Sequence, residues 1–216
     1  MDKLYLYLNL FTISIPLILS FDKKVAFYRN WKYLFPAIFI MVTLFIAWDA
    51  IFTYYGIWSF NDDYLIGFRM LGLPLEEWMF FIVVPYACVF IYACLIAYLK
   101  VDPLKKIYRP FLLVLSFILI VSAAIHFNRL YTSITFFATS LLILYNLKKN
   151  QPWLSMFLLS YFVIIIPFLT VNGILTGSFI DDQVVWYNPA HILNIRIGTI
   201  PVEDIIYNLM MLMMTV

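Results

Sequence analysis

Residues 76–99 read EEWMFFIVVPYACVFIYACLIAYL, two acids followed by a long run without a charged side chain. A helix of roughly 20 apolar residues is long enough to cross the hydrocarbon core of a bilayer. The rest of the chain has the same character, since 65% of its 216 residues are hydrophobic, only 12% are charged, and the mean hydropathy is +0.94. Soluble domains contain about 45–50% apolar and about 25% charged residues. The composition therefore predicts an integral membrane protein and excludes a soluble or disordered chain.

The polar composition excludes several further classes. A net charge of +2 is too small to gather nucleic-acid phosphates, so no nucleic-acid partner is expected. Cys88 and Cys94 lie in one apolar run, which favours helix packing over redox chemistry or metal binding. The sequence shows no metal-ligand cluster, no Ser-His-Asp pattern and no glycine-rich phosphate loop. We therefore predict neither a metal nor another cofactor.

Apolar runs of spanning length predict an all-α fold, a polytopic transmembrane bundle of about seven helices. The predicted spans are 4–20, 33–57, 76–99, 110–127, 130–147, 153–176 and 202–216. The first run begins weakly basic and no small-residue cleavage site follows it, so we interpret it as a retained span rather than a signal peptide. The last run is short and ends at Val216 without a basic flank, so we expect the natural chain to extend further.

The distribution of Lys and Arg predicts the orientation in the membrane. Ten of the fourteen basic residues lie in the loops 21–32, 100–109 and 148–152. Seven alternating spans place these three loops on one face, which the positive-inside rule makes cytoplasmic. The N-terminus is then outside, and a bacterial cell membrane is the expected location.

Two outer loops end in matching sequences. Residues 69–77 read RMLGLPLEE and residues 196–204 read RIGTIPVED, so each holds an Arg, a Pro five residues later and an acidic pair that opens a span. Asn61 and Asn188 each stand eight residues before the Arg and extend the match. Ordinary helix capping explains part of this pattern, because Pro and acids both favour helix N-termini. The length of the match favours an internal duplication.

The duplication predicts how the chain is divided. Residues 1–107 would form a first three-helix repeat, 108–129 a linking span, and 130–216 a second three-helix repeat. Four helices separate equivalent elements, so the two repeats have the same orientation in the membrane, as in parallel-repeat transporters.

Four acids at the outer membrane boundary are the candidate catalytic residues: Glu76, Glu77, Glu203 and Asp204. Acids in a bilayer are costly and usually face the protein interior for a functional reason. Adjacent helix residues diverge by roughly 100°, so one acid of each pair can face a cavity while the other faces a loop or a neighbouring helix. The alternative is that the pairs are only caps, with Arg69 and Arg196 as counter-ions that hold the outer rim.

Other polar and aromatic residues support these acids. Asp49 and Asn172 lie near the outer ends of the preceding spans, and Trp58 and Trp78 belong to an aromatic group around the first acidic pair. Interfacial belts explain some of these rings. Rings beside an acid also suit a long apolar substrate and can stabilise a carbocation through their negative faces.

The duplicated Pro-x-Glu-acid element, opening an aromatic span after a Trp-containing outer loop, resembles the lycopene cyclase domain family. The resemblance covers nearly the whole chain, whose halves would match the two subunits of the bacterial two-subunit cyclases. It implies a lycopene β-cyclase, an isomerase without a cofactor that forms β-ionone rings on lycopene or another linear carotenoid within membrane lipid. It leaves open whether the chain forms a homo-oligomer or contacts other enzymes of the carotenoid pathway.

The resemblance also implies roles for the acids. Protonation of a terminal double bond, attack by an internal double bond and loss of a proton require one donor and one acceptor. Glu76 and Glu203 are expected to be the principal proton-transfer acids, with Glu77 and Asp204 as their partners. The replacement of Asp by Asn172 and of Glu by Asp204 in the second half leaves open whether there is one shared cavity or a single active site.

Three other readings stay open on the sequence alone. In a hydratase, water would capture the same cation, and a one-end cyclase would form a ring at only one end of the substrate. A proton-coupled transporter also combines repeats with intramembrane acids, although the middles of 110–127 and 130–147 are almost purely apolar. A structural membrane subunit would explain the repeat but not the acids.

Overall fold

The computed structural model describes residues 3–216 and contains seven α-helices among them. The helices are α1 (Leu4–Leu19), α2 (Trp31–Tyr54), α3 (Leu75–Tyr98), α4 (Tyr108–Ile125), α5 (Leu130–Lys148), α6 (Leu154–Leu175) and α7 (Val202–Thr215). Each begins and ends within three residues of a predicted span, which confirms the helical membrane bundle. Five of them, α2 to α6, are long and apolar enough to cross a membrane, whereas α1 and α7 are shorter.

The outer loops contain short strands that the sequence did not predict. β1 (Trp58–Phe60) pairs with β4 (Val185–Tyr187), β2 (Arg69–Met70) with β3 (Leu73–Pro74), and β5 (Arg196–Ile197) with β6 (Ile200–Pro201), all antiparallel. The two residues between β2 and β3, Leu71 and Gly72, both have positive φ (53° and 81°). A two-residue hairpin loop with a type I′ turn requires positive φ at both of its residues.

The two hairpins deliver the chain directly into α3 and α7. Pro74 and Pro201 are the N-cap residues of these helices. Each proline also ends a strand, where its fixed φ of −64° or −59° is compatible with the hairpin. The acidic pairs consequently occupy the second and third positions of their helices.

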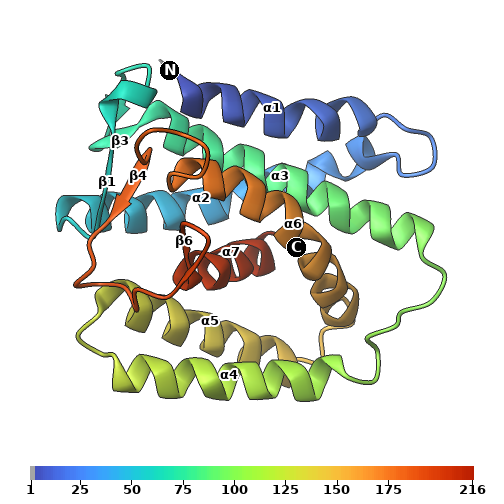
Figure 1. The fold of residues 1–216 in the computed structure, drawn as a ribbon. Coiled ribbons are helices and arrows are strands. Elements are labelled where there is room, and N and C mark those ends of the chain that lie inside the picture. Colours follow the sequence, from blue (N-terminus) through green and yellow to red (C-terminus); the bar gives the residue numbers. More distant parts are fainter. Residues whose placement is uncertain (1–2) are drawn as a thin grey trace.

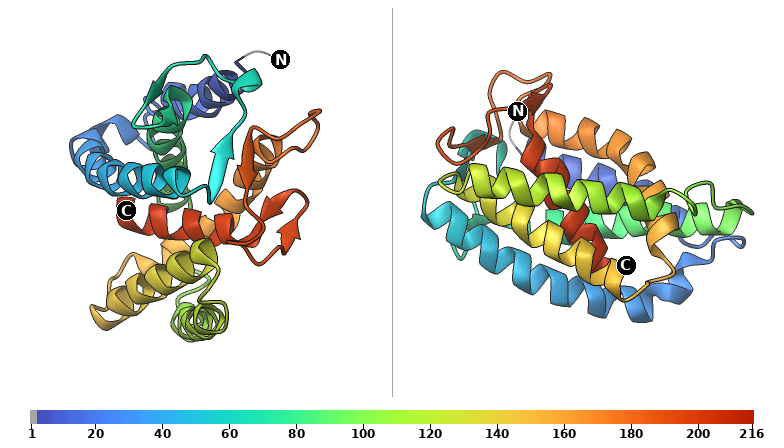
Figure 2. Two further views of the ribbon diagram at one scale, coloured as in Figure 1. Left: turned by 90° about the vertical axis from the view of Figure 1, so that its left-hand side faces the viewer. Right: turned by 90° about the horizontal axis from the view of Figure 1, so that it is seen from below.

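The helices run along one bundle with the strands gathered at one end (Figure 1). The three loops rich in Lys and Arg lie at the opposite end, as the topology prediction requires; which end faces the cytoplasm stays a proposal. α1 packs against α3, and α5 packs in the same way against α7. Figure 2 shows α4 at the edge of the bundle, where α5 is its main neighbour.

The β1–β4 ladder lies at the centre of the match between the two halves. Ser59 pairs with Trp186, and Asn61 and Asn188, the equivalent residues of the two outer loops, are separated by the same 127 positions as this pair. The ladder is therefore centred on one pair of equivalent positions, as a local two-fold axis at this point would require. The division into two repeats stays a proposal.

Candidate active site

The acidic pairs are buried beneath the outer loops. Glu76 and Glu203 are both 0% exposed, and Glu77 and Asp204 are nearly as buried. Ionised groups away from water need hydrogen-bond donors around them, so the partners of each carboxyl indicate its role.

Glu76 and Glu203 hold the loops in place. One oxygen of Glu76 accepts a hydrogen bond from the backbone N–H of Ile66 at 2.6 Å, and Glu203 accepts one from Leu193 N–H at 2.6 Å. In the second half, the hydroxyl of Thr132 also donates to Glu203. Neither carboxyl belongs to the lining of the cavity described below.

Glu77 and Asp204 face the interior. The hydroxyl of Tyr5 in α1 donates to Glu77 at 2.6 Å, and the hydroxyl of Tyr131 in α5 donates to Asp204 at 2.7 Å. α1 and α5 are the first helices of the two proposed repeats, so the two contacts would be a matched pair. Asp204 also accepts from Asn172 and from Tyr187, both at 2.8 Å.

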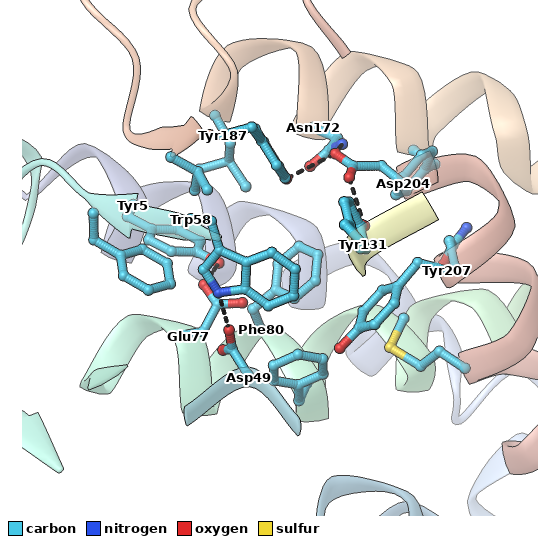
Figure 3. Close-up of a pocket in the computed structure, with 17 residues that line it drawn as sticks. Tyr5, Asp49, Trp58, Glu77, Phe80, Tyr131, Asn172, Tyr187, Asp204 and Tyr207 are labelled. Atoms are coloured by element: carbon cyan, nitrogen blue, oxygen red, sulfur yellow. Dashed lines mark hydrogen bonds between the residues drawn. The ribbon is translucent and has the colours of Figure 1, made fainter. Parts of the chain in front are cut away.

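Both carboxyls line one cavity, together with Asp49 (Figure 3). The indole N–H of Trp58 donates to one oxygen of Asp49, and the other oxygen has no protein partner. Figure 3 shows Glu77 and Asp49 on one side of the cavity and Asp204 on another. The cavity has about 60 Å³ of free space, room for a few water molecules.

The remaining walls are mostly aromatic and apolar. They comprise Phe60, Phe80, Phe81, Phe168, Leu175, Val185, Tyr207, Asn208 and Met211, besides the residues already named. Trp58 and Tyr131 meet edge to face with ring centroids 5.0 Å apart, and Tyr131 stacks on Tyr187 at 6.0 Å. No Lys or Arg belongs to this lining among the residues that the structure describes.

Tyr187 retains its proton in this setting. Burial and the neighbouring Asp204 carboxyl raise the pKa of Tyr187, in the outer loop, well above its usual value of 10.0. A tyrosine that stays neutral can donate to a carboxyl at any pH near neutrality.

Several residues predicted from the sequence lie outside the cavity. Arg69 forms an exposed salt bridge to Asp62 at 2.6 Å and donates to the carbonyl of Gly72, so it holds its own hairpin rather than an acid of the pair. Arg196 donates to the carbonyl of Thr199 in the equivalent hairpin. The indole of Trp78 donates to the carbonyl of Met70 at 3.3 Å. All three hold the loops, and neither Arg contacts the acidic pair for which the capping alternative made it the counter-ion.

The sequence reasoning missed several cavity residues, among them two that donate to the acids. Tyr5 and Tyr131 both follow the first residue of the first helix of their half, 126 positions apart. The duplication was recognised only around the acidic pairs, chiefly in residues 69–77 and 196–204. Extending it to the first helix of each half would have identified this tyrosine pair.

These features define a class of protein: a polytopic helical membrane protein with paired acids around an enclosed aromatic cavity. A sequence model of the lycopene cyclase family matches residues 2–95 and 128–216, and the chain therefore belongs to that family. The two matched segments contain α1 to α3 and α5 to α7, with α4 between them.

One relative matches the chain over a short segment. The chain is 35% identical over 57 residues to the bifunctional lycopene cyclase/phytoene synthase of Neurospora crassa. The aligned part covers 25% of this chain and 10% of the fungal protein. No solved structure matches the chain. The chain thus spans only a small part of that relative, and its own activity is a matter for proposal.

Proposed function

We propose that this protein is a lycopene β-cyclase, which forms β-ionone rings on a linear carotenoid by acid–base chemistry inside the membrane. The observation that carries the proposal is that Glu77 and Asp204, one from each half, line a single aromatic cavity. Membership of the lycopene cyclase family supplies the substrate class.

The reaction needs a proton donor beside an alkene. A carboxylic acid adds its proton to the terminal double bond and leaves a tertiary cation. The internal double bond supplies the electron pair for the new carbon–carbon bond, which moves the cation into the ring. Loss of a ring proton to a base completes the double bond, so atoms and electrons balance without an oxidant or reductant.

We assign the donor to the side of the cavity formed by Glu77 and Asp49. Two carboxyls that face one cavity repel each other when both are charged, so this side favours retention of one proton. Each of these acids has one hydrogen-bond donor from a side chain, Tyr5 for Glu77 and Trp58 for Asp49.

We assign the acceptor to Asp204. Tyr131, Asn172 and Tyr187 all donate to its two oxygens, which satisfies an anionic carboxylate at the place where a proton is removed. The surrounding rings stabilise the intermediate cation through their negative faces and exclude water, which would otherwise capture it.

This assignment changes the ranking that the sequence favoured. Glu76 and Glu203 were expected to be the principal acids, yet each is directed to a loop N–H and away from the cavity. We therefore propose Glu77 and Asp204 as the reacting pair, with Glu76 and Glu203 as the residues that hold the loops above them. Asp49, Trp58 and Asn172 support the pair.

The aromatic walls also favour the cyclase over a carrier of polar solutes. A polar solute needs several polar groups around it, whereas most of the lining side chains beyond the acids are aromatic or aliphatic.

The test is expression in cells that accumulate lycopene, followed by separation of the pigments. Production of β-carotene or of its one-ring precursor supports the proposal. Cells that keep only lycopene, although folded protein is present in the membrane, would refute it. The control is the double variant Glu77→Gln/Asp204→Asn, which keeps the shape of both side chains and should leave lycopene unchanged.

A further inference from the structure

A second, larger cavity opens on the side of the bundle between α1, α3 and α6. It has about 270 Å³ of free space. Phe11, on its α1 wall, is 67% exposed in the bundle, so this part of the wall lies at the surface that faces lipid. We call this cavity the lateral groove.

The lateral groove adjoins the acid cavity. Phe80, Phe168 and Asn172 line both spaces. Asn172 is also a hydrogen-bond donor to Asp204. A molecule that fills the groove and extends past these three side chains therefore reaches the proposed proton acceptor.

The chemistry of the lateral groove is that of hydrocarbon. Its walls are aliphatic and aromatic apart from Thr12, Cys88 and Asn172. The hydroxyl of Thr12 donates to the carbonyl of Leu8 in its own helix, and the amide of Asn172 donates to Asp204. These groups are already satisfied, so the groove suits a ligand that forms no hydrogen bonds.

The corresponding route in the other half is filled by rings. Asp49 and Asn172 are equivalent, and the same spacing makes Trp48 the counterpart of Val171 and Phe45 the counterpart of Phe168. The Tyr207 ring lies 4.9 Å from that of Phe45 and 5.7 Å from that of Trp48, measured between centroids. Where one half has the small Val171 and an open groove, the other half has a packed aromatic cluster.

We propose that the lateral groove holds the polyene chain of the carotenoid while one end of it reacts in the acid cavity. The inference rests on the proposed function and adds the route and the position of the substrate. The substrate is dissolved in lipid, and the groove lies between the lipid-facing surface and the acid cavity, so a substrate that passes Phe80, Phe168 and Asn172 reaches the acids without crossing water.

A single open route has a consequence for the order of ring formation. Only one end of the carotenoid can reach the acids at a time, because the second approach is closed. Formation of a second ring then requires the one-ring product to leave the groove and return with its other end first. The one-ring product should therefore appear free in the membrane before the two-ring product.

The test places a tryptophan at position 171 in the open groove, because Trp48 occupies the equivalent position in the closed half. Val171→Trp should lower both ring formation and the amount of carotenoid that copurifies with the protein at least tenfold. Ala87→Leu narrows the groove from α3 and should act in the same direction, which guards against a folding defect of one variant. The matched control is Ile166→Trp, on the same helix but 70% exposed and outside the groove, and it should behave as the wild type.

The outcomes separate the two proposals. If the wild type copurifies with carotenoid but forms no ring, the cyclase assignment fails and the groove assignment stands. If Val171→Trp and Ala87→Leu are folded, by their thermal unfolding in detergent, and still form rings and retain carotenoid like the wild type, the groove assignment is overturned. Copurification of phospholipid alone with the wild type would likewise overturn it, because an acyl chain would then be the occupant.

Discussion

Separate replacement of Glu76 and of Glu77 by Gln distinguishes the acid that reacts from the acid that holds a loop. Glu77→Gln keeps the oxygen that accepts from Tyr5 at 2.6 Å, so the fold should persist, but it removes the transferable proton. General acid catalysis contributes about 10²–10⁴-fold to a rate. That range corresponds to roughly 3–5 kcal/mol of barrier at 1.36 kcal/mol per tenfold change.

Glu76→Gln should have a much smaller effect. Its amide oxygen still accepts from Ile66 N–H, so the contact that holds the loop is kept. Hydrogen bonds to charged groups contribute about 1.5–3 kcal/mol and neutral ones about 0.5–1.5 kcal/mol, so this bond weakens by at most about 1 kcal/mol. Even if this passed entirely into the barrier, the rate would fall only about fivefold.

The assay is ring formation per unit of folded protein, from pigment separation in lycopene-accumulating cells and thermal unfolding of the purified variants in detergent. We expect Glu77→Gln to be far less active than Glu76→Gln at similar stability. The reverse order, with Glu76→Gln inactive and Glu77→Gln within fivefold of the wild type, would show that the aromatic cavity is not where the proton is transferred.

Three further perturbations test the supports of the site. Trp58→Phe keeps a ring but removes the donor to Asp49, so ring formation should fall about 10- to 100-fold, by pigment analysis, if that bond contributes about 1.5–3 kcal/mol. Leu73→Ala, at a fully buried loop position, should destabilise the protein by about 2–5 kcal/mol in thermal unfolding. Because the pKa of Tyr187 is raised above 10.0 in the folded protein, its stabilising contribution is complete below pH 10 and is lost as the pH rises further. Tyr187→Phe should therefore lose less stability than the wild type in unfolding measured above pH 10.

The helices could be predicted from the sequence because a spanning helix needs a long apolar run, and such runs are unambiguous. The predicted span 33–57 became Trp31–Tyr54, a shift of two or three residues at each end. The strands could not be predicted in this way. They are two or three residues long, too short for a visible alternation of apolar and polar residues.

The sequence located the acidic pairs but could not determine which acid of each pair faces the cavity. Neighbouring positions on a helix point about 100° apart, and the choice depends on where the partner helices lie. In the structure α1 and α5 bring Tyr5 and Tyr131 onto the third helical positions, Glu77 and Asp204, while the loops cover the second. That information is tertiary, and it is the basis on which we propose Glu77 and Asp204, in place of Glu76 and Glu203, as the reacting acids.

In the proposed mechanism, the departure from symmetry at Asp49 and Asn172 is what lets two similar halves perform two different proton transfers. Identical halves would place identical acids around the cavity, with no basis for one to give a proton and the other to take it. Asp49 adds a second carboxyl on the side of Glu77, where a shared proton can be held, whereas the amide of Asn172 donates to Asp204 and favours its charged form. Exchanging one carboxyl for an amide therefore gives a duplicated scaffold an acid side and a base side around one substrate end.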